Sequence, residues 1–160
     1  MSSTILVHPN PLLRQVATPV PPALFGTPAL QSMIARMEQA LAEEHNGIGL
    51  AATQIGLSHR IILVELPREG VVAFLNPEIL QSSKDTILFE EGCLSVPGVF
   101  GLVRRKRAVE VRAYTPQGTE RIMKWKDLYA VVFQHEIDHL NGILFVDKIE
   151  QSTNGSDVRV

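Results

Sequence analysis

Two histidines and a glutamate near the end of the chain have the spacing of a helical metal site. They lie in the segment VVFQHEIDHLNG, residues 131–142, which contains the pattern His-Glu-x-x-His. On a helix, His135 and His139 lie one turn apart on one face, so both imidazoles can reach the same ion. Glu136 lies beside that face and can act as a general base on a metal-activated water without being a ligand. Two core or surface histidines on a helix would give the same letters, so the pattern needs a third ligand.

The third ligand has one good candidate in this sequence. Catalytic sites of this type use three protein ligands and leave one position for water. No histidine follows His139; Asp147 lies in LFVDKI and Glu150 lies near the polar tail. Cys93, the only cysteine, sits in the irregular segment EEGCLSVPG at the end of a strand, where a thiolate could face the histidines. The alternative for a lone cysteine is inert packing in the core.

Composition and charge describe an ordinary globular protein. The chain has 160 residues, of which 45% are hydrophobic and 20% charged, with a formal net charge of −2. This balance predicts one folded domain and gives no indication of nucleic-acid binding. No apolar run approaches the roughly 20 residues that span a membrane, and the start lacks a signal-peptide layout. We therefore expect a cytoplasmic monomer without a membrane segment, and a single cysteine excludes an internal disulfide.

Two segments have the pattern of α-helices. The first begins with Thr27 as N-cap, has a proline at its first helical position, carries apolar residues at helical spacing, and is stopped by Asn46 and Gly47. The second carries the histidines, begins at Asp127 as its predicted N-cap, and is stopped by Gly142.

Short β-branched runs between the two helices predict strands. They lie at residues 60–66, 71–77, 86–92 and, around a Pro-Gln-Gly turn, in two parts of 108–125. Segment 47–56 is too rich in Gly and Ala for a regular strand. The order predicts an α+β fold, with mostly antiparallel sheets packed around the metal-binding helix and a second long helix nearer the N-terminus. We expect one catalytic domain at residues 1–150 and a short, polar, frayed tail at 151–160.

Two charged features are open to more than one interpretation. The basic run RRKR, residues 104–107, precedes alternating residues and is interpreted as a solvated strand edge, which discourages edge-to-edge association. Asp138 falls on the other flank of His135, where it is either a partner for a histidine or part of the surface.

The sequence resembles the peptide deformylase family in three blocks. They are GIGLAATQ (47–54), EGCLS (91–95) and QHEIDH (134–139). Weaker similarity extends over residues 4–150. The resemblance implies the peptide deformylase-like fold and a hydrolase that removes the formyl group from the N-terminal methionine of newly made proteins. It also implies that Cys93, His135 and His139 hold one divalent ion, typically Fe²⁺, with Zn²⁺, Ni²⁺ or Co²⁺ able to substitute. The ligand types alone do not choose between these metals.

The resemblance also implies roles for the residues around the metal. Glu136 would take a proton from water and deliver it to the leaving amine. The Gln54 side-chain amide and the Leu94 backbone N–H would stabilise the oxyanion, and the peptide would pair with the loop as an added strand. The residues expected to bind the peptide or its methionine side chain are Gly47, Ile48, Gly49, Phe89, Glu91, Gly92, Leu128, Val131 and Val132.

The implied partner is an N-formyl-methionyl nascent peptide, with transient ribosome contact and no membrane or specific nucleic-acid contact. Phe100 stands where many relatives carry an arginine near the rim of the substrate site, so a relative with low or altered activity is an alternative. The tail after Ile149 is shorter than the C-terminal helix with which some relatives are thought to dock on the ribosome. A general His-Glu-x-x-His metalloprotease, with no role for Cys93 or Gln54, is the other alternative.

Overall fold

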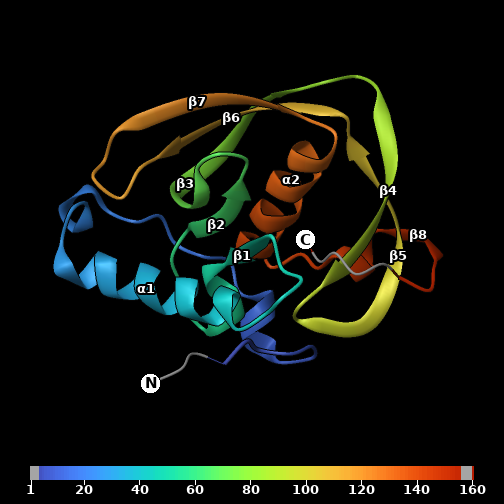
Figure 1. Ribbon diagram of the computed structural model, residues 1–160, viewed down its shortest axis with the longest axis horizontal. Helices are drawn as coiled ribbons and strands as arrows, with labels where there is room; N and C mark the ends of the chain where they lie inside the picture. Colours follow the sequence, from blue (N-terminus) through green and yellow to red (C-terminus); the bar gives the residue numbers. More distant parts are fainter. Residues whose placement is uncertain (1–3, 156–159) are drawn as a thin grey trace.

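Two antiparallel sheets frame the computed structural model, which describes residues 4–155 and residue 160 (Figure 1). Among these residues, the larger sheet has the strand order β1 (Gly49–Ala51), β2 (Ile61–Leu66), β3 (Gly70–Ser82), β6 (Ala108–Tyr114) and β7 (Glu120–Lys126). The smaller sheet has the order β4 (Thr86–Cys93), β5 (Val96–Lys106) and β8 (Ile149–Ser152). Strand β1 therefore forms an edge of one sheet, and β4 forms an edge of the other.

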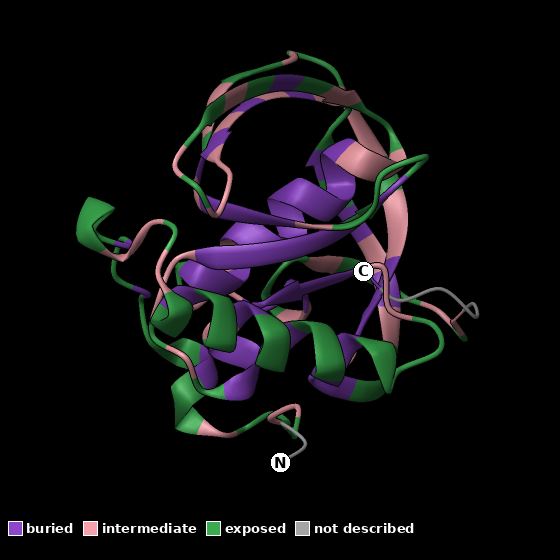
Figure 2. Ribbon diagram, turned by 60° about the vertical axis from the view of Figure 1, so that its left-hand side comes forward, coloured by how far each residue is buried: buried purple, intermediate pink, exposed green. Residues whose placement is uncertain are grey.

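The helices occupy different positions relative to the sheets. The α-helices are α1 (Pro28–Ala42) and α2 (Leu128–Leu140), and the 3-10 helices are η1 (Pro11–Arg14), η2 (Pro22–Leu24), η3 (Ala52–Ile55) and η4 (Phe145–Asp147). Helix α1 packs against β1 and β2 on the outside, whereas α2 contacts β1, β2 and β7 of the larger sheet and β5 of the smaller one. Figure 2 shows the difference: α2 is buried along most of its length, and α1 exposes its outer face.

The start of α1 follows the predicted capping chemistry. Thr27 Oγ1 accepts a hydrogen bond from the Leu30 N–H at 3.3 Å and donates one to the Leu24 carbonyl at 2.7 Å. Pro28 occupies the first helical position, where its missing N–H costs nothing. The helix ends at Ala42, earlier than the predicted stop at residues 46–47.

The ends of α2 depend on backbone more than on side chains. Asp127 is the N-cap residue, as predicted, but it has a φ of +53° and its side chain makes no capping hydrogen bond. Its backbone N–H instead bonds the Arg107 carbonyl at 2.8 Å. Gly142 has a φ of +73°, and a Cβ atom there would collide with the carbonyl oxygen of Arg14. Glycine is therefore required where the helix stops.

The expected α+β class, with antiparallel sheets around the histidine-bearing helix, is confirmed. Strands β2, β3, β4, β6 and β7 follow the predicted runs, although β3 extends to Ser82. Three of the described strands were not predicted: β1, β5, and β8, which pairs with β5. The Gly- and Ala-rich segment 47–56 contains the short strand β1. No helix among the described residues is long and apolar enough to cross a lipid bilayer.

The segment predicted as a frayed tail is partly ordered against β5. Gln151 and Ser152 belong to β8 and pair with Leu102 and Gly101. The Thr153 N–H extends this pairing by bonding the Phe100 carbonyl at 3.1 Å. Strand formation here depends on β5, which lies far away in the sequence, so local polarity misled the prediction. Residues 156–159 of the predicted tail lie outside the described residues.

Candidate metal centre and active site

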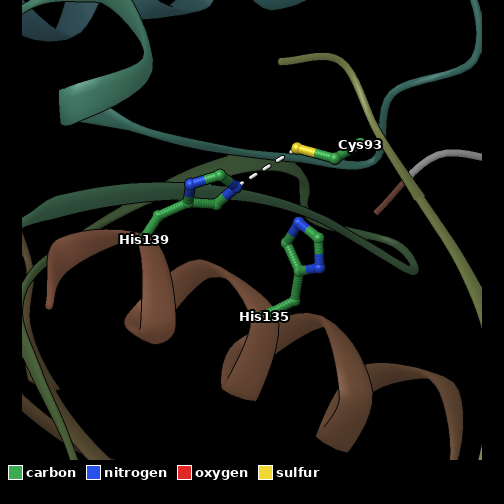
Figure 3. Close-up of side chains that lie close together, drawn as sticks. All are labelled: Cys93, His135 and His139. Carbon is green, nitrogen blue, oxygen red and sulfur yellow. Dashed lines mark hydrogen bonds between the residues drawn. The ribbon is translucent and has the colours of Figure 1, made fainter. Parts of the chain in front are cut away.

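Cys93, His135 and His139 form a buried group whose ligand atoms all lie within 4.8 Å of one another. Cys93 ends β4, and both histidines project from one face of α2 toward its sulfur (Figure 3). Cys93 Sγ and His139 Nε2 are 3.3 Å apart. Metal–sulfur and metal–nitrogen bonds of about 2.3 and 2.0 Å at a tetrahedral ion would separate such atoms by about 3.5 Å. The three side chains therefore fit one ion with little movement.

The hydrogen bonds of the histidines leave nitrogen lone pairs for an ion. His135 Nδ1 lies 2.8 Å from Glu91 Oε1, whereas His135 Nε2 is buried without a hydrogen-bond partner among the described residues. In the protein without a metal, burial lowers the pKa of His135, but its interactions with Cys93 and Glu91 outweigh this and raise the value to about 10, so the ring is charged. A bound metal would replace the proton on Nε2 and leave the one on Nδ1, donated to Glu91. Burial lowers the pKa of His139 well below its ordinary value, so its imidazole is neutral, as a ligand must be.

Arg105 holds the carboxylate that orients His135. Its guanidinium donates two hydrogen bonds to Glu91, at 2.8 and 2.9 Å, and one to Asp138 at 2.6 Å. Burial raises the pKa of Glu91, but hydrogen bonds and charge from Arg105 and His135 outweigh it and lower the value to about 2. Glu91 is therefore an ionised carboxylate inside the protein, paired on both sides.

The interpretation of residues 104–107 as a solvated edge is wrong for Arg105, whose side chain is 3% exposed. Side chains alternate between the two faces of a strand, and this alternation could have identified Arg105 as buried. On β5, Val103 and Arg105 point inward while Arg104 points outward. Asp138 also differs from both expectations. It pairs with Arg105 and, at 2.9 Å, with Lys148, rather than with a histidine or with solvent alone.

Replacing Arg105 with methionine should lower the free energy of unfolding by about 3–5 kcal/mol, because the buried Glu91 carboxylate loses its cationic partner. The matched control is Arg104→Met on the neighbouring residue. Its ion pair with Glu150 leaves the side chains 49% and 46% exposed, and such pairs contribute less than about 1 kcal/mol. Urea unfolding of both variants measures the difference, and equal losses would contradict the role of burial.

The buried carboxylate of Glu136 lies next to Gly49 of β1. The side chain is fully buried, and neither carboxylate oxygen has a hydrogen-bond partner among residues 4–155 and 160. Burial raises the pKa of Glu136 to about 7, although the charge of His135 opposes this shift. A carboxylate with a pKa near neutrality can both accept and return a proton, as general acid–base catalysis requires.

Gly49 leaves the space that this carboxylate fills. A Cβ atom at residue 49 would lie 2.8 Å from Glu136 Oε1 and 3.1 Å from the Glu136 carboxyl carbon. These distances are too short, so any side chain on residue 49 would displace the carboxylate. Gly49 therefore positions Glu136, in addition to its expected contact with the peptide.

Gly49→Ala should lower kcat roughly 100-fold while the metal content stays unchanged, because a displacement of about 1 Å at a reacting group has this effect. Steady-state kinetics and elemental analysis measure the two quantities. The control is the same substitution in a Glu136→Ala background, where it should cause no further loss. A full additional loss in that background would show that Gly49 acts on something other than Glu136.

Gln54 and Leu94 flank the sulfur of Cys93. Gln54 Oε1 accepts a hydrogen bond from the Ala51 N–H at 2.9 Å. Its Nε2 donates to Ser95 Oγ at 3.0 Å and lies 3.7 Å from Cys93 Sγ. Leu94 follows Cys93 in the turn between β4 and β5. The amide group of Gln54 is thus fixed at both ends beside the metal-ligand group, and Ser95 is a partner that the sequence did not single out.

The family model described as polypeptide deformylase matches residues 2–155 of this chain. The chain belongs to the peptide deformylase family. A peptide deformylase of Rhizobium meliloti is 37% identical over 154 residues, which cover 92% of this chain and 84% of that relative.

Solved structures agree with this assignment. The crystal structure of a peptide deformylase from Thermotoga maritima is 37% identical with a TM-score of 0.87, over 94% of this chain and 99% of that one. The Met-Ala-Ser-bound crystal structure of a class I type b peptide deformylase from Acinetobacter baumannii is 35% identical, also with a TM-score of 0.87, over 93% and 99%.

Family membership confirms the predicted class of enzyme. Peptide deformylases are metal-dependent hydrolases that remove the formyl group from the N-terminal methionine of newly made polypeptides, and this chain is an enzyme of that class. The comparisons give no support to the alternative of low or altered activity due to Phe100, nor to a general metalloprotease.

Five of the residues that the deformylase resemblance assigned to the peptide lie on three segments of the chain. Ile48 precedes β1, Gly92 lies on the edge strand β4, and Leu128, Val131 and Val132 lie on α2. Ile48, Leu128 and Val132 belong to one apolar cluster, and Val131 is fully buried. These apolar side chains are a candidate pocket for the methionine side chain.

The remaining predicted peptide contacts differ among themselves. Gly47 lies against Leu94, because a Cβ atom on it would lie 2.9 Å from Leu94 Cδ1. Phe89 is half-buried on β4, on the same side as Glu91. Glu91 departs from the expectation, because its side chain is 0% exposed and is bonded to protein groups on both sides.

Proposed function

We propose that Cys93, His135 and His139 hold one divalent metal ion, Fe²⁺ in the cell, at which this enzyme hydrolyses the formamide of N-formyl-methionyl peptides. The observation that carries the proposal is the close grouping of three buried ligand atoms within 4.8 Å. When bound, the ion lowers the pKa of a water molecule beside the formyl group and polarises the formyl oxygen. A Cys/His/His set accepts Fe²⁺, Zn²⁺, Ni²⁺ or Co²⁺, and the choice of Fe²⁺ rests on the family's usual preference.

Glu136 moves the proton in this proposal. Its carboxylate takes a proton from the attacking water and later delivers it to the nitrogen of the leaving amine. Its burial beside Gly49 keeps it free of other partners among the described residues, so both oxygens are available for this exchange.

Gln54 and Leu94 stabilise the negative charge that develops on the formyl oxygen. The Gln54 amide is already oriented, because Ala51 holds its oxygen and leaves Nε2 directed toward Cys93. The backbone N–H of Leu94 is the second donor. Removing one donor of this kind typically raises the barrier by about 3–4 kcal/mol.

The peptide binds between the two sheets as an added strand. Strand β1 is an edge of the larger sheet and β4 is an edge of the smaller one, so an extended chain can bond to both edges. Gly49 and Gly92 allow close backbone approach, while Ile48, Leu128 and Val132 receive the methionine side chain. The Met-Ala-Ser bound to the Acinetobacter baumannii relative supports this kind of ligand.

The proposal extends to the compartment, the partners and the oligomeric state of the enzyme. The enzyme acts in the cytoplasm on nascent chains, with transient contact to the ribosome, and it works as a monomer with residues 1–150 as its single catalytic domain. It requires no membrane and no specific nucleic-acid contact.

A panel of three peptides tests the proposed substrate class. N-formyl-Met-Ala-Ser should release formate rapidly, N-acetyl-Met-Ala-Ser should release no acetate, and N-formyl-Asp-Ala-Ser should react slowly because its charged side chain enters an apolar pocket. Equal rates with the methionyl and aspartyl peptides would contradict the proposed pocket. Reaction of the acetyl peptide at the formyl rate would contradict the proposed substrate class.

A further inference from the structure

The segment after α2 leads back to the peptide site along β5. Strand β8 pairs with β5 through Ser152 and Gly101, and the Thr153 N–H then bonds the Phe100 carbonyl. Gly155 lies against the Phe100 ring, because a Cβ atom on it would lie 2.5 Å from a ring carbon. Phe100 itself is opposite Gly92 in the β4–β5 pair. Residues 149–155 are therefore held along β5, on the side of the smaller sheet opposite to the β4 edge proposed to bind the peptide.

Val160 lies within that proposed peptide site. Its backbone N–H donates a hydrogen bond to the carbonyl of Gly92, the residue before the ligand Cys93, at 3.3 Å. Its side chain is 3% exposed and belongs to the same apolar cluster as Ile48, Leu128 and Val132. In Figure 1 the end of the chain marked C lies between β1 and β5 in that view.

These two contacts are those expected of a methionyl peptide: one backbone bond to the edge of β4 and one apolar side chain among the pocket residues. We infer that Val160 is a resident occupant of the methionine pocket, which a substrate peptide must displace. The inference rests on the proposed function for the identity of the pocket. Phe100 gives the tail an apolar surface through its contact with Gly155.

A tethered occupant acts as an intramolecular competitor. Its effective concentration is set by the chain and does not change with dilution. Because it binds the free enzyme and leaves when substrate enters, it should raise KM and leave kcat unchanged. A weaker occupant should therefore lower KM, and a better one should raise it.

Val160→Asp should lower KM for N-formyl-Met-Ala-Ser by about three- to tenfold at constant kcat, because a charge is unfavourable in the apolar cluster and residue 160 leaves it. Val160→Met should raise KM, since methionine is the side chain that the pocket is proposed to fit. The matched control is Val16→Asp, at a residue that is 64% exposed, and it should change neither constant. The same KM in all four proteins would overturn the inference.

A second variant acts through the tail without touching the pocket. Gly155→Ala places a Cβ against the Phe100 ring at a φ of +93°, so it should loosen the segment and lower KM as Val160→Asp does. If KM were unchanged in Gly155→Ala but lowered in Val160→Asp, the lower KM would be due to the new charge alone. That result would overturn the inference that the tail occupies the pocket.

Calorimetric binding of Met-Ala-Ser separates this inference from the proposed function. Binding should be tighter to Val160→Asp than to the unchanged protein, whether or not either releases formate. Absence of formate release by all variants would refute the function and leave the binding difference intact. Formate release by the unchanged protein, with equal peptide binding by both, would refute the inference and leave the function intact.

Discussion

Replacing Glu136 with alanine should lower kcat for formyl-peptide hydrolysis by roughly 100- to 10,000-fold, the usual contribution of a positioned general acid–base. The reason is geometric as well as chemical. Glu136 is fully buried beside His135, and its oxygens have no hydrogen-bond partner among the described residues. The Glu136 carboxylate fills the space that the missing side chain of Gly49 leaves. Among the carboxylates that the structure describes, Glu91 cannot replace it, because Glu91 is committed to Arg105 and His135.

The metal should remain bound in this variant, since Glu136 is not among the three grouped ligands. Glu136→Gln provides the matched control, because it keeps the shape of the side chain and removes only its ability to accept a proton. Both variants should show the same loss of kcat with unchanged metal content. A variant with its metal bound and full activity would show that another group moves the proton.

Cys93→Ser should remove most of the bound metal and, with it, the activity. A neutral hydroxyl replaces a thiolate ligand, so the affinity for the metal should fall. The loss should exceed the 10- to 100-fold that is typical when a metal ligand loses its hydrogen-bond partner. Elemental analysis after dialysis against a weak chelator measures the loss. His8→Ala offers a matched control, because His8 lies in the N-terminal segment and outside the ligand group.

The single cysteine supplies a second measurement that is independent of activity. Because Cys93 is the only thiol in the chain, alkylation reports on this residue alone. A metal-bound thiolate should react slowly with an alkylating reagent, and a strong chelator should accelerate the reaction. Equal alkylation rates with and without the chelator would contradict Cys93 as a ligand.

The part of the site that sequence could predict is the part carried by short, regular spacing. His135 and His139 four residues apart on one helix face, and a lone cysteine after a strand, were enough to suggest three side chains that the fold brings together. Gln54 and Leu94 came from the resemblance alone. Their geometry depends on the short turn after β4 and on the 3-10 helix after β1, which no periodicity indicates.

The residues that were missed depend on contacts distant in sequence. Arg105 was hidden in a basic run, and only its inward position on β5 reveals it as the partner of Glu91 and Asp138. Strand β8 has a polar sequence that predicts disorder, and it forms because the outer edge of β5 is available to pair with it. Val160 is further still from any local signal, since its hydrogen-bond partner Gly92 lies on β4 and the apolar cluster that it joins is formed by residues far away in the sequence.

Formate release from N-formyl-Met-Ala-Ser tests the central claim most directly. The protein would be purified without oxygen and loaded with Fe²⁺ or Ni²⁺, because a thiolate ligand and ferrous iron are both easily oxidised. We expect rapid release of formate in equal amount to free Met-Ala-Ser, and nearly none from the metal-loaded Glu136→Ala protein. No formate from a fully metal-loaded, unchanged protein, or equal release by the Glu136→Ala protein, would contradict the claim.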